Sequence, residues 1–277
     1  MIAVSANGNP SGNWTKYRIS NKSTVDGVDS WLDYEGWGFN KDIVVATGNY
    51  FTFGGSFAGY VKAFCFSKAD MIAAKPLTAV EFIDKTTFTI QVAKTDDKTT
   101  PFVFGCSIDS SVPGPAMRIY AWRNILTANP EMVYNSITVP DYDYVGTPPS
   151  AGGAFLASLS GRLVDATYRS GSLLTAHTTR ALTGANRSQV TWYELKPNSW
   201  PTSGNPSLGQ AGNVSFTGDA WAFLPGINKN SAGDISMVFT RSSQSIIGDV
   251  MGVARKSSDA KGKMGTPFVL ATGDSAY

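Results

Sequence analysis

Short runs that alternate apolar with polar or small residues cover most of this chain, and glycine, asparagine, proline or serine separates them. Two such runs lie at residues 173–179 and 190–195, and comparable groups recur roughly every 45 to 55 residues along the sequence. Helical periodicity is confined to residues 68–74 and 122–128, each about two turns at most, which we expect to be connections. The pattern predicts an all-β protein built from repeated units.

Each repeated unit contains four predicted strands, except for an incomplete first unit that is a hairpin of residues 2–6 and 14–19. The complete units have strands expected at residues 31–34, 42–50, 59–66 and 77–83; at 88–92, 102–108, 117–122 and 132–139; at 162–168, 172–178, 190–195 and 213–216; and at 221–227, 234–240, 250–255 and 267–271. Repeated four-stranded units are typical of a β-propeller. We expect a single propeller domain over residues 1–277, with four-stranded antiparallel blades, about five in number, of which the first is incomplete.

Blade stacking predicts which strands are buried and which are crowded. Middle strands are covered on both faces and therefore read as nearly continuous apolar runs, as at residues 43–46 and 235–239. Inner strands crowd the axis of the ring, which favours small residues such as Gly36, Gly38 and Gly226. An open blade edge could also pair with another copy of the chain.

Charge and composition indicate which binding partners and which cellular location to expect. The chain has 23 basic and 21 acidic residues, and no basic run interleaves with aromatic residues, so we expect no nucleic-acid partner. No apolar stretch is long enough to span a bilayer. Richness in asparagine, threonine, serine and glycine is typical of exported bacterial proteins, which predicts a secreted or cell-surface location with the signal segment outside this sequence.

The two cysteines, Cys65 and Cys106, both lie in apolar runs, which favours buried thiols, with a disulfide as the alternative. Neither their number nor their spacing indicates a structural metal site, and we expect no cofactor. A structural Ca²⁺ ion is compatible with such a fold.

Several motifs resemble those of a family of exported bacterial β-propeller proteins in the neighbourhood of sialidase-like and BNR-repeat propellers. They lie at residues 2–5, 10–14, 33–34, 43–51, 174–178, 192–195, 210–212, 225–228 and 233–234. The resemblance covers essentially the whole chain and implies the fold more than a function, because many such proteins carry no established activity. It also implies an incomplete member, since such proteins usually continue beyond the equivalent of Tyr277 and this chain begins within a blade.

The chain departs from true sialidases in two respects. The Asp-box hairpin is missing, with residues 233–234 at most a remnant. A sialidase site would also need three arginines that converge on a carboxylate, together with a Tyr–Glu nucleophile pair. The sequence supplies candidates for these arginines at Arg118, Arg162, Arg169, Arg180 and Arg255.

Asp33, Tyr34 and Glu35 are the first candidate catalytic group, because they lie at the start of an inner strand, where side chains meet the channel mouth. Two carboxylates two residues apart should point the same way and could share a cation or divide acid and base roles. The alternative is that they link blades by hydrogen bonds. His177, the only histidine, is the other catalytic candidate, although its apolar middle strand favours a hydrogen-bonded structural role.

The candidate ligand-binding residues form two groups. Asp141 and Asp143 alternate with tyrosines in a crossover between blades, where they could line a sugar subsite or belong to a solvated loop. The second group is expected near the starts of the fourth and fifth inner strands, facing Asp33 and Tyr34 across a closed ring. Its members are Tyr168, Arg169, Asp219 and Trp221.

These features predict an exported binding module whose channel mouth offers acidic and aromatic groups to a glycan or peptide, without covalent chemistry. One alternative is a glycoside hydrolase with paired carboxylates drawn from Asp33, Glu35, Asp141, Asp143 and Asp219. Another is a polysaccharide lyase in which Tyr34 acts with His177 or Arg169 to remove a proton beside a uronate. The chain could also serve mainly as a packing element within a larger surface protein.

Overall fold

The computed structural model describes residues 1–144, 146–181 and 186–275. Strands account for 53% and helices for 3% of the chain, so the all-β prediction is confirmed. The one α-helix of the described residues is α1 (Lys68–Ile72), and a short 3₁₀ turn, η1 (Leu159–Gly161), precedes β13. No helix in these residues has the length and apolar character needed to cross a membrane.

Strand order follows chain order within each group of strands. An N-terminal hairpin of β1 (Ile2–Ser5) and β2 (Trp14–Tyr17) forms a two-stranded sheet, as expected. Four antiparallel groups follow. Sheet A contains β4 (Val28–Phe39), β5 (Ile43–Thr52), β6 (Phe57–Ser67) and β7 (Val80–Asp84), with β3 (Lys22–Val25) paired to β4.

Sheet B contains β8 (Gln91–Val92), β10 (Val103–Ile108), β11 (Ala116–Arg123) and β12 (Glu131–Thr138). Sheet C contains β13 (Leu163–Arg169), β14 (Ser172–Arg180), β15 (Ser188–Lys196) and β16 (Ser207–Val214). Sheet D contains β17 (Trp221–Lys229), β18 (Ile235–Ser243), β19 (Ile246–Arg255) and β20 (Phe268–Ala271). The four-strand grouping predicted from the alternating pattern is therefore present in all four sheets.

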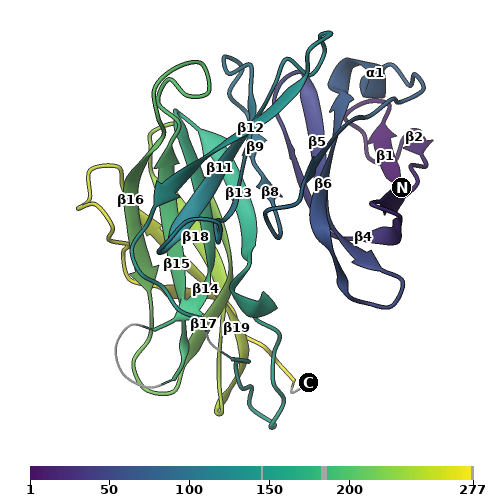
Figure 1. Cartoon of the computed structure of the whole chain (residues 1–277). Helices are drawn as coiled ribbons and strands as arrows, with labels where there is room; N and C mark the ends of the chain where they lie inside the picture. The colour runs from purple at the N-terminus through teal and green to yellow at the C-terminus, as the bar shows by residue number, and fades with distance from the viewer. Residues whose placement is uncertain (145, 182–185, 276–277) are drawn as a thin grey trace.

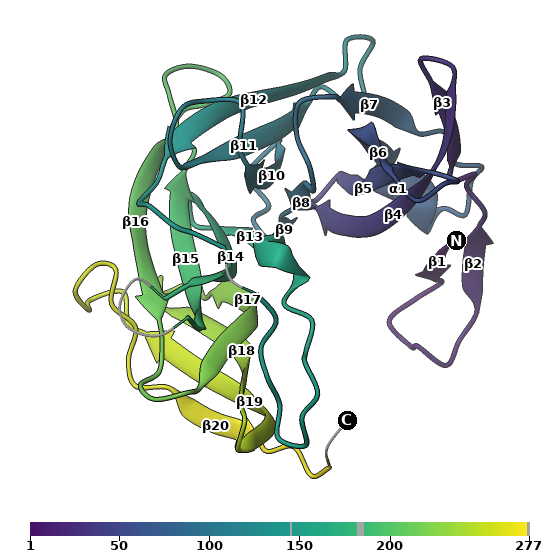
Figure 2. The ribbon, with the colours of Figure 1, turned by 60° about the horizontal axis from the view of Figure 1, so that its bottom comes forward.

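The four sheets lie side by side in an arc, with β4, β8, β13 and β17 toward the inside and β7, β12, β16 and β20 outside (Figure 2). The N-terminal hairpin and sheet A occupy one side of the molecule, and sheets C and D occupy the other (Figure 1). Within the described ranges, no hydrogen-bonded strand pair joins sheet D to sheet A or to the hairpin. The arc is open.

The inner strands run in the same direction. The short strand β9 (Lys94–Thr95) pairs in parallel with Phe39 near the end of β4 and with Thr167 near the end of β13, which joins sheets A and C into one hydrogen-bonded sheet. The side chain of Arg169, at the end of β13, donates a hydrogen bond of 3.3 Å to the carbonyl oxygen of Lys229, at the end of β17. The inner strands therefore all begin at one end of the molecule, which we call the start end, and all finish at the other, which we call the far end.

Backbones approach closely where β4 passes the segment that contains β8. A Cβ atom on Gly36 would lie 2.6 Å from the carbonyl oxygen of Ile90, and one on Gly38 would lie 2.4 Å from that of Ala93. The expected crowding of inner strands is therefore present at both glycines. Gly226 differs, because a Cβ there would meet its nearest neighbour at 3.6 Å, an ordinary van der Waals distance.

The hydrophobic core is divided into clusters that lie between successive sheets. In sheet C, Leu173 and Tyr193 belong to the cluster shared with sheet B, whereas Leu174 and Trp192 belong to the cluster shared with sheet D. The middle strands β14 and β15 are consequently buried on both faces, as blade stacking requires. Val45 and Ala46 of β5 likewise contribute to clusters on opposite faces of sheet A.

Two local predictions were wrong. Residues 235–239 are not covered on both faces, because Met237 is buried while Val238 is 48% exposed on the face of sheet D that no other described sheet covers. The outer strand expected at residues 213–216 is β16, which begins several residues earlier, in a segment whose glycine and polar residues obscure the alternation. Residues 122–128, expected to be a connection, are the end of β11 and part of the turn that leads to β12.

Both cysteines are buried free thiols, as favoured from the sequence: Cys65 lies in β6 and Cys106 in β10. Burial raises the pKa of both thiols, that of Cys106 to about 12. They therefore pack as small hydrophobic groups.

Sheet B encloses a charged network around Arg118, whose side chain is fully buried. Its guanidinium lies 3.1 Å from the carboxylate of Asp84 and 2.9 Å from that of Asp109. Burial alone would raise the pKa of Asp109, but hydrogen bonds from Ser111 and Ser136 lower it to about 2. The network satisfies charges that would otherwise be costly inside the fold.

We predict that Arg118→Met will lower the free energy of unfolding by about 3 to 5 kcal/mol, because it leaves two buried carboxylates without their cation. Urea denaturation followed by circular dichroism measures this change. The control is Arg180→Met, which removes an arginine from an exposed pair with Asp143 and should cost less than about 1 kcal/mol. Equal losses in the two variants would contradict the assignment of Arg118 as a central stabilising residue.

Candidate functional site

A β-bulge in β4 sets the positions of the first candidate group. Asp33 pairs with Asn49 and Gly36 with Thr47, so Tyr34 and Glu35 together oppose a single residue, Gly48, and Tyr34 has a φ of 58°. A bulge interrupts the alternation of side chains. Asp33 and Glu35 therefore do not point the same way, and the prediction that they do was wrong.

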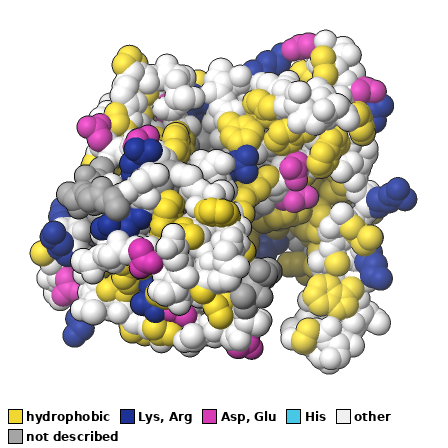
Figure 3. Space-filling view, turned by 90° about the horizontal axis from the view of Figure 1, so that it is seen from below, with side chains coloured by type: hydrophobic (Ala, Val, Ile, Leu, Met, Phe, Trp, Pro, Cys, Tyr) yellow, Lys and Arg dark blue, Asp and Glu magenta, His cyan; other side chains and the backbone are white. Residues whose placement is uncertain are grey.

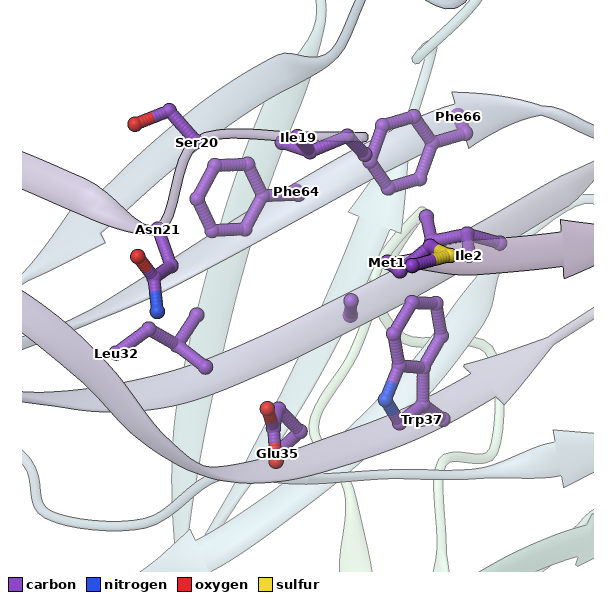
Figure 4. A pocket seen from close by; sticks show the side chains of 11 residues that line it. Met1, Ile2, Ile19, Ser20, Asn21, Leu32, Glu35, Trp37, Phe64 and Phe66 are labelled. Carbon is purple, nitrogen blue, oxygen red and sulfur yellow. The ribbon is translucent and has the colours of Figure 1, made fainter. Parts of the chain in front are cut away.

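Glu35 faces the N-terminal hairpin. It lines a hollow of 290 Å³ together with Leu32 and Trp37 of the same strand and with Met1 and Ile2 (Figure 4). Asp33 is exposed and accepts a hydrogen bond of 2.9 Å from the backbone N–H of Tyr34. The two carboxylates thus have different surroundings and share no hollow.

Tyr34 lies on the other side of sheet A, against Arg162 at the start of β13. The Cζ atom of Arg162 is 5.3 Å from the ring centroid of Tyr34 and 5.0 Å from that of Phe88. Burial raises the pKa of Tyr34, and the charge of Arg162 opposes that rise. Contacts of a guanidinium with two aromatic rings stabilise the cation without a carboxylate.

Arg162 lacks the partners that a half-buried arginine normally has. Its Nε atom is buried without a hydrogen-bond partner, and no carboxylate of the described residues lies within ion-pair distance of its side chain. The sequence had identified Arg162 only as one of several arginines. The sequence did contain an indication of its place, because Arg162 directly follows Gly161 and directly precedes an apolar inner strand, as expected of a residue at the start end.

Arg162 lines a hollow of 220 Å³, which we call the Arg162 hollow. Four side chains with hydroxyl groups, one of them a tyrosine, and three apolar side chains surround it, contributed by segments within or next to sheets B and C. The lining residues are Phe88, Thr89, Ile108, Ser110, Tyr144, Ser160, Arg162 and Leu163. Viewed toward the start end, the surface is hollowed between the sheets and displays hydrophobic side chains (Figure 3).

A third hollow, of 600 Å³, contains two of the predicted ligand-binding residues, Asp219 and Trp221. We call it the Trp221 hollow. Arg187, which the sequence analysis did not single out, also lines it and donates a hydrogen bond of 3.3 Å to the carbonyl oxygen of Gly218. Thr147 and Phe155 of the crossover between β12 and η1 complete one wall. Asp219 and Trp221 are therefore together, but Tyr34 lies in a different place.

Asp141 and Asp143 are exposed at the beginning of this crossover and line neither hollow. Asp143 pairs with Arg180 at 3.4 Å. The intervening Tyr142 packs edge-on against the ring of His177, with centroids 4.9 Å apart. Of this segment, Tyr144 is the residue that reaches the Arg162 hollow.

Tyr168 and Arg169 were predicted to lie near the start of their inner strand, and this was wrong. They are the last residues of β13 and lie at the far end, because the turn at Ser170 and Gly171 follows them directly. Tyr168 is buried against Phe104, with ring centroids 4.7 Å apart. The predicted convergence of these residues with Tyr34 and Trp221 therefore does not occur.

His177 is fully buried within β14. Its Nδ1 donates a hydrogen bond of 2.8 Å to the carbonyl oxygen of Gly161, which fixes the tautomer, and its Nε2 accepts one of 3.1 Å from the hydroxyl of Tyr193. Burial lowers the pKa of His177 to about 4. The geometry supports the structural alternative, since a base in this position has no access to a ligand.

In the part of the chain that the structure describes, no group of three His, Cys, Asp or Glu side chains is arranged to hold a metal ion. No protein-family model, curated protein or solved structure matches this chain. The resemblance to sialidase-like and BNR-repeat propellers therefore stays a prediction based on short motifs.

We predict that the fold loses about 2 kcal/mol of stability between pH 7 and pH 5 because of His177. The unfolded chain takes up a proton near pH 6.5, whereas the folded chain does so only near pH 4, so acidification in this window favours unfolding. Chemical denaturation at a series of pH values measures the slope. His177→Gln should flatten it, and an unchanged slope in this variant would show that other groups are responsible.

Proposed function

We propose that the chain is a binding module of the β-propeller type, in which sheets A to D are successive blades of an open arc. The proposal is supported by four-stranded antiparallel sheets in chain order, cores between successive sheets and inner strands that run in one direction. Membership in a larger ring and export from the cell stay predictions from the sequence.

The binding surface of this module is its start end, and the Arg162 hollow is the observation that carries the assignment. An unpaired guanidinium held between two rings can donate hydrogen bonds to a ligand without first breaking an ion pair. The hydroxyls of Thr89, Ser110 and Ser160 add further donors and acceptors. Aromatic faces with hydroxyl and guanidinium groups suit a glycan, whose apolar ring faces and hydroxyls alternate.

The hydrolase alternative has less support. A glycoside hydrolase needs two carboxyl groups about 5 to 10 Å apart on either side of the scissile bond. Glu35 lines the hollow beside the N-terminal hairpin and Asp219 lines the Trp221 hollow, and neither of these hollows contains a second of the predicted carboxylates. A lyase that uses His177 would require a base that is fully buried.

We predict that Arg162→Gln will weaken glycan binding by about tenfold or more, the effect of losing a hydrogen bond to a charged donor. Arg162→Lys should give an intermediate loss, because lysine keeps the charge but not the planar stacking on Tyr34 and Phe88. Calorimetry with oligosaccharides selected on a glycan array, alongside acidic peptides, measures the affinities.

The matched control is Arg187→Gln in the Trp221 hollow, which should leave this affinity unchanged. The reverse pattern, with binding lost in Arg187→Gln and kept in Arg162→Gln, would transfer the site to the Trp221 hollow. Preference for peptides over all glycans would contradict the glycan assignment.

We expect no turnover of chromogenic glycosides by the purified protein, because the hollow that holds Glu35 and the one that holds Asp219 each lack a second of the predicted carboxylates. The screen is repeated on Asp33→Asn. Hydrolysis by the wild-type protein that disappears in this variant would overturn the binding assignment and favour the hydrolase.

A further inference from the structure

A fourth hollow, of 270 Å³, lies at the far end between sheets C and D, remote from the Arg162 hollow. We call it the lysine hollow. The loop that connects β19 to β20 extends beside β16 at its rim (Figure 2), and the backbone N–H of Gly262 in this loop donates a hydrogen bond of 2.9 Å to the side chain of Gln210. Its charged lining residues are Glu194, Lys196, Lys229, Arg255 and Lys261.

Two lysines share one carboxylate at the base of this hollow. The Nζ atoms of Lys196 and Lys229 each lie 2.9 Å from the same oxygen of Glu194. Both also donate to the hydroxyl of Ser172, at 2.6 Å and 2.9 Å. Because an ammonium group has three N–H donors, each lysine retains one donor beyond these two contacts.

Glu194 is committed to these contacts. Its second carboxylate oxygen accepts a hydrogen bond of 2.7 Å from Gln210. Burial raises the pKa of Glu194, but hydrogen bonds from Ser172, Lys196 and Lys229 outweigh this and hold the pKa well below its usual range. A single negative charge therefore faces two ammonium groups, of which Lys229 is only 8% exposed.

Arg255 and Lys261 add to the excess of positive charge. The guanidinium of Arg255 is oriented by the carbonyl oxygens of Asp259 and Lys263, at 2.7 Å and 3.1 Å. Across the described ranges, neither Arg255 nor Lys261 has a carboxylate within ion-pair distance. Lys196 and Lys229 are held close together by the carboxylate oxygen that they share, so their charges repel one another, and an anion bound in the hollow would relieve this repulsion.

We propose that the lysine hollow binds a tetrahedral oxyanion, a phosphate or sulfate group, either free or as an ester on a larger ligand. Lysine ammonium groups with free donors, together with a guanidinium, form charge-assisted hydrogen bonds to the several oxygens of such an anion. The site does not depend on the proposed function, because it lies at the opposite end of the inner strands.

Titration calorimetry with inorganic phosphate and with inorganic sulfate tests the proposal, with ionic strength held constant by sodium chloride. We expect saturable binding at one site. Lys196→Met should weaken it about tenfold or more, and Lys261→Gln about fivefold, since each removes a charged donor. The matched control is Lys263→Gln, in the same loop but outside the lining, which should change the affinity less than twofold.

Arg162→Gln should bind the anion as the wild-type protein does, which separates this site from the glycan-binding proposal. Comparison of the two titrations shows whether phosphate or sulfate is the preferred group. Lys261 is exposed in a loop, so its variant tests the site even if Lys196→Met fails to fold. Binding that never saturates with either anion, or equal losses in Lys261→Gln and Lys263→Gln, would overturn the proposal.

Discussion

The close contact between the inner backbones is the constraint on which the remaining structure depends. Gly36 and Gly38 have no side chain where β4 meets residues 90–93, and the hydroxyl of Thr47 donates a hydrogen bond of 2.6 Å to the carbonyl oxygen of Ile90. This contact fixes the spacing of sheets A and B at their inner edges. As a result, Tyr34 and Phe88 come close enough to hold Arg162 between them.

Stacking the sheets face to face places polar side chains of the middle strands inside the fold, where each needs a partner. Arg118 has two carboxylates, and His177 has one hydrogen bond at each ring nitrogen. Arg162 and the lysine hollow differ from Arg118 in their balance of charge, because no carboxylate of the described residues pairs with Arg162 and a single carboxylate, Glu194, faces two lysines. This excess of positive charge distinguishes the two surfaces assigned to binding from the neutralised network around Arg118.

The alternation of apolar and polar residues predicted the four strands of each sheet, because strands buried on one or both faces leave that pattern in the sequence. It could not predict the bulge at Tyr34 and Glu35, since a tyrosine with positive φ has no sequence signal. The placement of Tyr168 and Arg169 failed for a different reason. The strands expected at residues 162–168 and 172–178 put both residues at the end of the inner strand, as in β13, so grouping them with side chains at strand starts was inconsistent with the expected strands themselves.

The two buried thiols lie in different hydrophobic clusters, each between a different pair of sheets. Cys65 belongs to the cluster between sheets A and B, and Cys106 to the cluster between sheets B and C. In an open array each layer is supported mainly by its neighbours, so the terminal layers can detach without disrupting the whole array. A thiol-specific reagent can reach either sulfur only when the two sheets that enclose that cysteine separate. The native chain therefore carries two internal reporters, whose alkylation kinetics would reveal the order in which adjacent layers separate.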